Sequence, residues 1–203
     1  MHETATLGDN VFVLPGANVM AASRVRKDCI IHSWAVIAAS KIGEGCSIRE
    51  NAHVVGATIG RHCLLQAGAI VKDLSVLGDY ILMQKNARIG FNVKVGNASI
   101  FEEGCCIGDD SFIGDGCTIH AGAIVGSFCV LKDGAVVPAG TVVPTMAVVY
   151  GPKKPAPPAA VVEQRSLSPR PLFLACYSVC LLVLVICFLV AATSAVHPTP
   201  LVL

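Results

Sequence analysis

An apolar residue recurs at every sixth position through most of this 203-residue chain. The series runs unbroken from Ile59 to Val149, and two slips of one residue carry it back to Leu7, which gives 25 hexads. A six-residue unit is too short for a pair of helices, but it fits one short strand and a turn, stacked as a parallel β-helix. At three hexads per coil, the pattern predicts an all-β domain of about eight coils.

A second stripe, made of small residues, stands two positions before the first. Six cysteines occupy it interchangeably with alanine and serine: Cys29, Cys46, Cys63, Cys105, Cys117 and Cys129. Free cysteine packs as a small hydrophobe, so we predict that these six fill the interior without disulfide or redox chemistry. Cys106 is the one cysteine of the repeat outside this stripe.

The composition divides the chain into three parts. Residues 1–151 form the repeat domain, residues 152–171 are a Pro-rich linker, and residues 172–196 contain no charge. A helix over the last stretch would be about 37 Å long, enough to cross a bilayer. Basic residues precede this stretch and none follows it. We therefore predict a transmembrane tail anchor, with the β-helix on the cytosolic side.

Charge excludes one class of partner and leaves another open. In residues 1–151, thirteen acidic residues outnumber eleven basic residues, so no basic patch is expected to bind nucleic acid. Five acidic residues occur close together at turn positions: Glu102, Glu103, Asp109, Asp110 and Asp115. They form either a solvated rim or a docking surface for a basic partner.

The histidines are candidates for metal binding or catalysis, and a zinc site needs three or four of them, or of other ligands, to converge. The chain has six of them: His2, His32, His53, His62, His120 and His197. His32 and His120 both follow an interior aliphatic residue directly, but five coils of about 4.8 Å would hold them about 24 Å apart. We therefore predict no catalytic, metal-binding or cofactor-binding residues.

Residues 24–60 resemble the γ-class carbonic anhydrases, which are left-handed β-helices. Arg26 and Asp28 match part of an Arg-Gly-Asp motif, and the turn Ile42-Gly43-Glu44-Gly45 follows. The zinc-binding histidines of those enzymes would fall on Val55, Ala67 and Lys72. None of these residues is a histidine, so the resemblance implies the left-handed scaffold and argues against the hydratase.

Residues 20–152 are most similar to non-enzymatic relatives of that family, the pointed-end subunits of dynactin of the subunit 6 type. The resemblance is carried by residues 42–55, IGEGCSIRENAHVV, and residues 136–152, VVPAGTVVPTMAVVYGP. It implies a non-catalytic scaffold that supports dynein-driven transport along microtubules. The implied partners are a sister β-helix subunit and an actin-related protein, and the implied location is cytoplasmic, associated with the cytoskeleton.

Two enzyme-related alternatives stay open. One is a degenerate γ-carbonic-anhydrase-like protein, which would gain support if a trimer brought His32, His53 or His120 together between subunits. The other is a hexapeptide acyltransferase that uses His120 as a general base between subunits. The unbroken register from Ile59 to Val149 counts against the second, because it leaves no inserted loop to close over an acyl donor.

Overall fold

The computed structural model describes residues 5–20 and 22–151, and these residues fold into three parallel sheets. Sheet A contains β1 (Thr6–Leu7), β4 (Arg24–Val25), β7 (Lys41–Ile42), β10 (Thr58–Ile59), β13 (Val76–Leu77), β16 (Lys94–Val95), β19 (Phe112–Ile113), β22 (Val130–Leu131) and β25 (Val148–Val149). Sheet B contains β2 (Phe12–Val13), β5 (Ile30–Ile31), β8 (Ser47–Ile48), β11 (Leu64–Leu65), β14 (Leu82–Met83), β17 (Ile100–Phe101), β20 (Thr118–Ile119) and β23 (Val136–Val137). Sheet C contains β3 (Asn18–Val19), β6 (Val36–Ala38), β9 (His53–Val55), β12 (Ile70–Val71), β15 (Arg88–Ile89), β18 (Cys106–Ile107), β21 (Ile124–Val125) and β24 (Val142–Val143).

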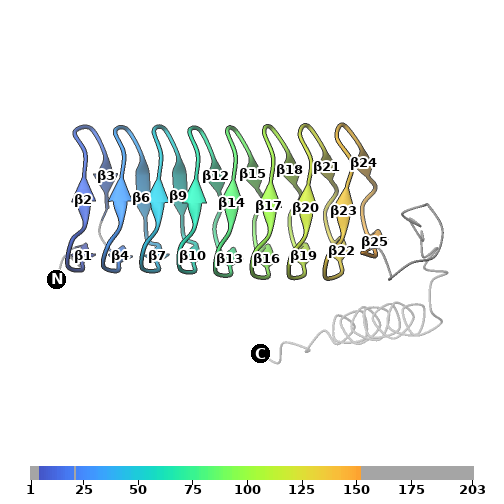
Figure 1. The fold of residues 1–203 in the computed structure, drawn as a ribbon, viewed down its shortest axis with the longest axis horizontal. Helices are drawn as coiled ribbons and strands as arrows, with labels where there is room; N and C mark the ends of the chain where they lie inside the picture. The colour runs from blue at the N-terminus through green and yellow to red at the C-terminus, as the bar shows by residue number, and fades with distance from the viewer. Residues whose placement is uncertain (1–4, 21, 152–203) are drawn as a thin grey trace, which may run out of the picture. The chain divides into compact units, whose positions relative to one another are not determined.

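Successive strands lie in different sheets, and each strand pairs with the strand three places further along the chain. Three strands, one from each sheet, therefore make one triangular coil. Successive coils stack along the axis of the β-helix (Figure 1). We name the corners after the sheets they join: the A–B, B–C and C–A corners. The all-β parallel β-helix of about eight coils, predicted from the hexads, is confirmed.

The interior consists of the large apolar residues that recur every sixth position and of the small residues two positions before them. In sheet B, Ile31 pairs with Ile48 and Phe101 with Ile119, so each interior side chain packs on its equivalent one coil away. Ile31 and Phe101 are fully buried. Burying each such side chain contributes roughly 1.5–3 kcal/mol, which makes the column of aliphatic residues the main source of stability.

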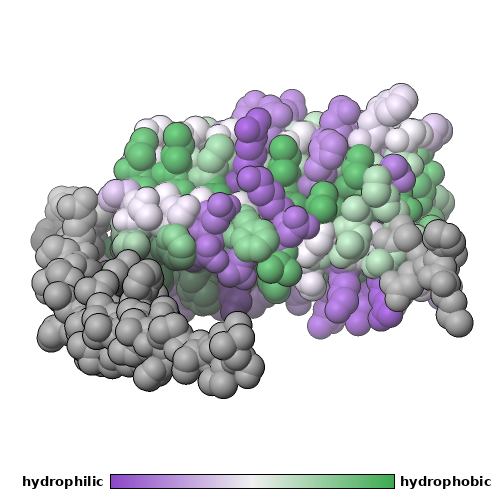
Figure 2. Space-filling model, turned by 180° about the vertical axis from the view of Figure 1, so that it is seen from behind, coloured by the Kyte–Doolittle hydropathy of each residue, from purple (hydrophilic) through white to green (hydrophobic). Residues whose placement is uncertain are grey.

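The outward residues of the strands, unlike the inward ones, are not restricted to apolar side chains. Those of sheet C include the polar His53 and Arg88 beside the apolar Ile124 and Val142. The face seen from behind accordingly mixes hydrophilic and hydrophobic side chains (Figure 2). Solvent, rather than packing, surrounds this side of the strands, so the hexad pattern constrains only the inward position.

The two slips in the hexad register shorten the same corner. They fall between Ile37 and Ile42 and between Val54 and Ile59, where β6 and β9 are each three residues long and pair along their whole length. The C–A corner loses one residue in both coils. Because the two shortened turns stack on each other, the sheets continue through them without a bulge.

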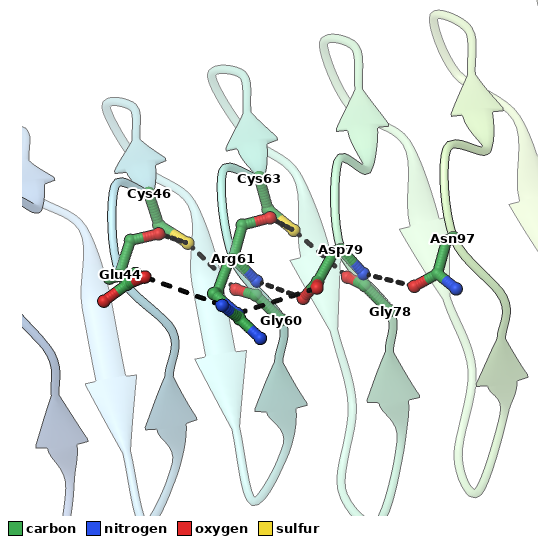
Figure 3. A network of polar contacts seen from close by, with 8 residues as sticks. All are labelled: Glu44, Cys46, Gly60, Arg61, Cys63, Gly78, Asp79 and Asn97. Carbon is green, nitrogen blue, oxygen red and sulfur yellow. Dashed lines mark hydrogen bonds and ion pairs between the residues drawn. The ribbon is translucent and has the colours of Figure 1, made fainter.

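A ladder of side chains holds the A–B corner. Oδ1 of Asp79 accepts a hydrogen bond from the backbone N–H of Arg61 at 2.7 Å, and Oδ1 of Asn97 accepts one from that of Asp79 at 2.8 Å (Figure 3). The Arg61 guanidinium also lies 3.7 Å from a carboxylate oxygen of Glu44 and 3.7 Å from one of Asp79. Asp and Asn are interchangeable in the ladder because both present an oxygen acceptor. Exposed ion pairs contribute little energy, so the ladder chiefly sets how adjacent coils align.

The predicted linker at residues 152–171 and span at residues 172–196 lie outside the described residues. Within residues 5–20 and 22–151, no helix is long and apolar enough to cross a bilayer. The membrane anchor and its orientation therefore stay predictions.

Candidate active site at the B–C corner

A line of polar side chains follows the B–C corner along the axis of the β-helix. Each member comes directly after the interior residue of a sheet B strand, and successive members are one coil apart. The line consists of His32, Arg49, Gln66, Gln84, Glu102 and His120. It contains two of the histidines considered above; a carboxylate lies beside each, Glu102 of the line beside His120 and Glu50, next to Arg49, beside His32.

His120 and Glu102 form the pair with the better-defined geometry. Nδ1 of His120 lies 3.1 Å from Oε1 of Glu102, which stands one coil before it. The second oxygen, Oε2, accepts a hydrogen bond from the backbone N–H of Ala121 at 3.0 Å. Both carboxylate oxygens are therefore engaged, and the Glu102 side chain is fixed relative to the turn that carries His120.

This contact favours one tautomer of His120. A carboxylate accepts hydrogen bonds, so Nδ1 carries the proton and Nε2 keeps its lone pair. The imidazole is 39% exposed, which leaves it accessible from solvent. A histidine oriented by a carboxylate through one nitrogen, with the other nitrogen free to accept a proton, is the arrangement of a general base.

His32 and Glu50 form a second pair at the same corner. Nδ1 of His32 lies 3.1 Å from Oε1 of Glu50, but the imidazole is only 17% exposed. The Glu50 backbone N–H and the nearby His32 hold the pKa of the Glu50 carboxyl below its usual range. β5 and β20 are five strands apart in sheet B, about 24 Å, so His32 and His120 do not meet within one chain.

The remaining candidates are dispersed. His53 points outward from β9 in sheet C, and His62 lies at the A–B corner, stacked on Tyr80 with ring centroids 5.2 Å apart. His2 and His197 lie outside the described residues. In the part of the chain that the structure describes, no group of three or more His, Cys, Asp or Glu side chains is arranged to hold a metal ion.

The three positions matched to carbonic anhydrase ligands do not converge within the chain either. Lys72 and Val55 are neighbours in adjacent coils at the C–A corner, as the pairing of Val71 with Val54 shows. Ala67 lies at the B–C corner, after β11. Ala67 is therefore at a different corner of the β-helix from Val55 and Lys72.

The acidic residues predicted as one rim or docking surface are divided among three corners. Glu102 and Glu103 follow β17 at the B–C corner, Asp109 and Asp110 precede β19 at the C–A corner, and Asp115 follows β19 at the A–B corner. Glu102 was not predicted from the sequence as the partner of His120. The signal was present, because the two residues are 18 positions apart, which is one coil.

Part of the chain around His120 matches a known protein family. Residues 86–120 and 110–145, which include Glu102 and His120, match the family model described as bacterial transferase hexapeptide (six repeats). No curated protein matches the chain. The predicted hexapeptide repeat and left-handed β-helix are confirmed.

Solved structures similar to this chain include two acyltransferases and one protein bound to CoA. The UDP-N-acetylglucosamine acyltransferase of Campylobacter jejuni is 19% identical, with a TM-score of 0.42 over 73% of this chain and 68% of that one. The enzyme of the same description from Bacteroides fragilis is 18% identical, with a TM-score of 0.43 over 73% and 68%. PerB of Caulobacter crescentus, solved in complex with CoA and GDP-perosamine, is 17% identical, with a TM-score of 0.33 over 74% and 56%. With TM-scores below 0.5, these likenesses carry no conclusion about substrate.

Two predictions are wrong in the light of the family match. The non-catalytic dynactin-type scaffold is overturned, because the repeats that contain His120 match a transferase model. For the same reason, the prediction that the chain is not an enzyme is wrong. The sister β-helix subunit and the actin-related protein were expected from the dynactin resemblance alone, and no finding here tests them. The resemblance misled because hexad proteins share the repeat itself, whatever their function.

Proposed function

We propose that this chain is an acyltransferase of the hexapeptide-repeat type, with His120 as its general base. The observation that carries the proposal is the 3.1 Å contact between Nδ1 of His120 and the doubly anchored carboxylate of Glu102. The match of residues 86–145 to a transferase family supports it, since both residues lie inside the match.

The arrangement suits transfer of an acyl group from a thioester to a hydroxyl or amine. Nε2 of His120 removes the proton from the acceptor while its oxygen or nitrogen attacks the thioester carbonyl. The new C–O or C–N bond forms, the C–S bond breaks, and the departing thiolate takes the proton from the imidazolium. Glu102 holds the ring in place and stabilises its positive charge during transfer.

Among the described residues, 5–20 and 22–151, the His120 imidazole is partly exposed to solvent. In these ranges, every turn at the B–C corner is four residues long, so no longer loop is inserted beside the imidazole. Acyl transfer requires that water be kept from the activated carbonyl. We therefore propose that a second copy of the chain covers the site.

A thiol-release assay tests the function. The full-length protein is mixed with acetyl-CoA and a panel of primary amines and sugar hydroxyls, and free thiol is measured. His120→Asn should lower kcat by about 10²–10⁴-fold, since it removes the proton acceptor. Glu102→Gln should lower kcat by a smaller factor with little change in KM, because the ring loses its charge partner but not its acceptor.

His32→Asn is the matched control, because it removes a histidine from the same corner and the same kind of pair. It should leave turnover unchanged. Equal turnover of wild type and His120→Asn with every acceptor that reacts would refute the assignment of His120.

A further inference from the structure

A hollow of about 250 Å³ opens on the outer face of sheet A, beside the A–B corner. It belongs to a different sheet face from the polar line of His120. Its lining residues are Val76, Lys94, Val95, Gly96, Phe112, Gly114, Asp115 and Asp133. Ligand sites for drug-sized molecules begin at about 300 Å³, so this hollow suits one side chain or one small head group.

Two carboxylates form one wall of the hollow. Asp115 and Asp133 stand one coil apart in the A–B ladder, and their Oδ1 atoms lie over Gly96 and Gly114, where a side chain would collide with them. Each Oδ1 accepts a hydrogen bond from a backbone N–H one coil back, from Asn97 and Asp115 respectively. Among the described residues, no donor reaches either Oδ2 atom, and no basic group lies within 4.0 Å of either carboxylate.

The opposite wall is apolar. Val76, Lys94 and Phe112 are outward residues of adjacent strands, so the aliphatic stem of Lys94 lies between the Val76 and Phe112 side chains. Val76 is 44% exposed and Phe112 is 47% exposed. An exposed phenyl ring presents a negative face that attracts cations.

The charges lining the hollow do not cancel. Two carboxylates and one ammonium leave a net charge of −1, which a single monovalent cation neutralises. A guanidinium carries the one positive charge that is needed. It is also planar, stacks on aromatic rings and donates pairs of hydrogen bonds to carboxylate oxygens. An ammonium ion satisfies the charge but not the stacking.

We propose that this hollow binds one guanidinium group, with its plane on Phe112 and its N–H groups donating to the Oδ2 atoms of Asp115 and Asp133. The group can be a free small guanidine or the arginine side chain of a protein. Both sources share the same chemistry and are separated by the choice of probe.

Isothermal titration calorimetry of the full-length protein tests the proposal with three probes. They are methylguanidine, the tripeptide acetyl-Ala-Arg-Ala-amide, and the same tripeptide with norleucine in place of arginine. The arginine peptide should bind saturably, and the norleucine peptide should not. Equal affinity for methylguanidine and the arginine peptide indicates a free guanidine as ligand, whereas tighter binding of the peptide indicates a protein side chain.

The chain itself offers a substitution that preserves the ladder. Asn97 already serves in it through Oδ1, so Asp115→Asn and Asp133→Asn keep the acceptor and remove only the charge. The double variant should weaken arginine-peptide binding by at least about tenfold, because charged hydrogen bonds are lost. Phe112→Leu should weaken it by a smaller factor.

Asp79→Asn is the matched control, since it makes the same change in the same ladder outside the lining of the hollow. It should leave the dissociation constant unchanged. Absence of saturable binding by both guanidinium probes, or equal affinity of wild type and the double variant, would overturn the proposal.

Discussion

At the scale of single residues, several cysteines and serines of the small stripe donate hydrogen bonds as well as filling space. The thiol of Cys63 donates to the carbonyl of Gly78 at 3.3 Å, and the hydroxyl of Ser75 donates to that of Gly90 at 2.8 Å (Figure 3 shows the cysteine). Cysteine and serine thus satisfy the same kind of corner carbonyl one coil away. The seven cysteines in the described residues are free thiols, and burial raises the pKa of Cys105 to about 12, which keeps it protonated and unreactive near neutral pH.

Cys63 provides the test of this slot. Cys63→Ser keeps both the size and the donor and should change the free energy of unfolding by no more than about 1 kcal/mol. Cys63→Asp places a carboxylate in a position that is 1% exposed, and should cost several kcal/mol or prevent folding. Thermal unfolding followed by circular dichroism measures both, and equal stability of the two variants would contradict an interior slot.

At the scale of the element, each turn carries one residue with a left-handed backbone. Asparagine and glycine tolerate this conformation well, and they hold it at Asn86, Asn92 and Gly104. Leu74 holds it too, with φ at 59°, although its side chain is 61% exposed and buries little. The turn is therefore set by the coils on either side of it rather than by the preference of Leu74.

Leu74→Asn should accordingly stabilise the protein. It relieves a backbone strain of about 1 kcal/mol, and in the next coil the amide of Asn92 already donates to Asp110 at 2.7 Å. We expect a rise in melting temperature of a few degrees. Val76→Asn, at an exposed strand position only two residues away, should lower it, because asparagine disfavours strands. A fall in both variants would show that Leu74 makes contacts that matter more than its backbone.

At the scale of the whole β-helix, stability depends on each coil having a neighbour on both sides. Coils in the middle bury their interior residues completely, as Leu65 shows. Among the described strands, those of the first coil pair on one side only. Its interior residues Leu7 and Val13 are 47% and 40% exposed, although they occupy the same hexad position as Leu65.

The same substitution should therefore have different costs along the axis. Leu65→Ala should lower the free energy of unfolding by about 2–5 kcal/mol. Leu7→Ala should lower it by less than about 1 kcal/mol, because the side chain already meets solvent. Chemical denaturation of the full-length protein measures both. Similar costs would mean that the first coil is covered in solution.

The hexad period was sufficient to predict the strands, their interior residues and both slips. This was possible because one residue type at one spacing meets one physical requirement, an apolar column. The pairing of Glu102 with His120 was missed, since it depends on two residues that are distant in sequence and adjacent only after coiling. The hollow at Phe112 was beyond the pattern altogether, because its shape comes from outward side chains that the repeat does not constrain.

The coil of 18 residues also determines how the length of this protein can change. Duplication of one whole coil adds a step of about 4.8 Å to the stack and leaves every other coil in register. Such a duplication leaves His120 and Glu102 in contact if it falls before Glu102 or after His120. Insertion between them of an 18-residue coil that carries neither residue would instead place the two side chains about 9.6 Å apart along the axis and break the pair. The interval from 102 to 120 is thus the one stretch of the repeat in which a change of length would remove the proposed base from its carboxylate.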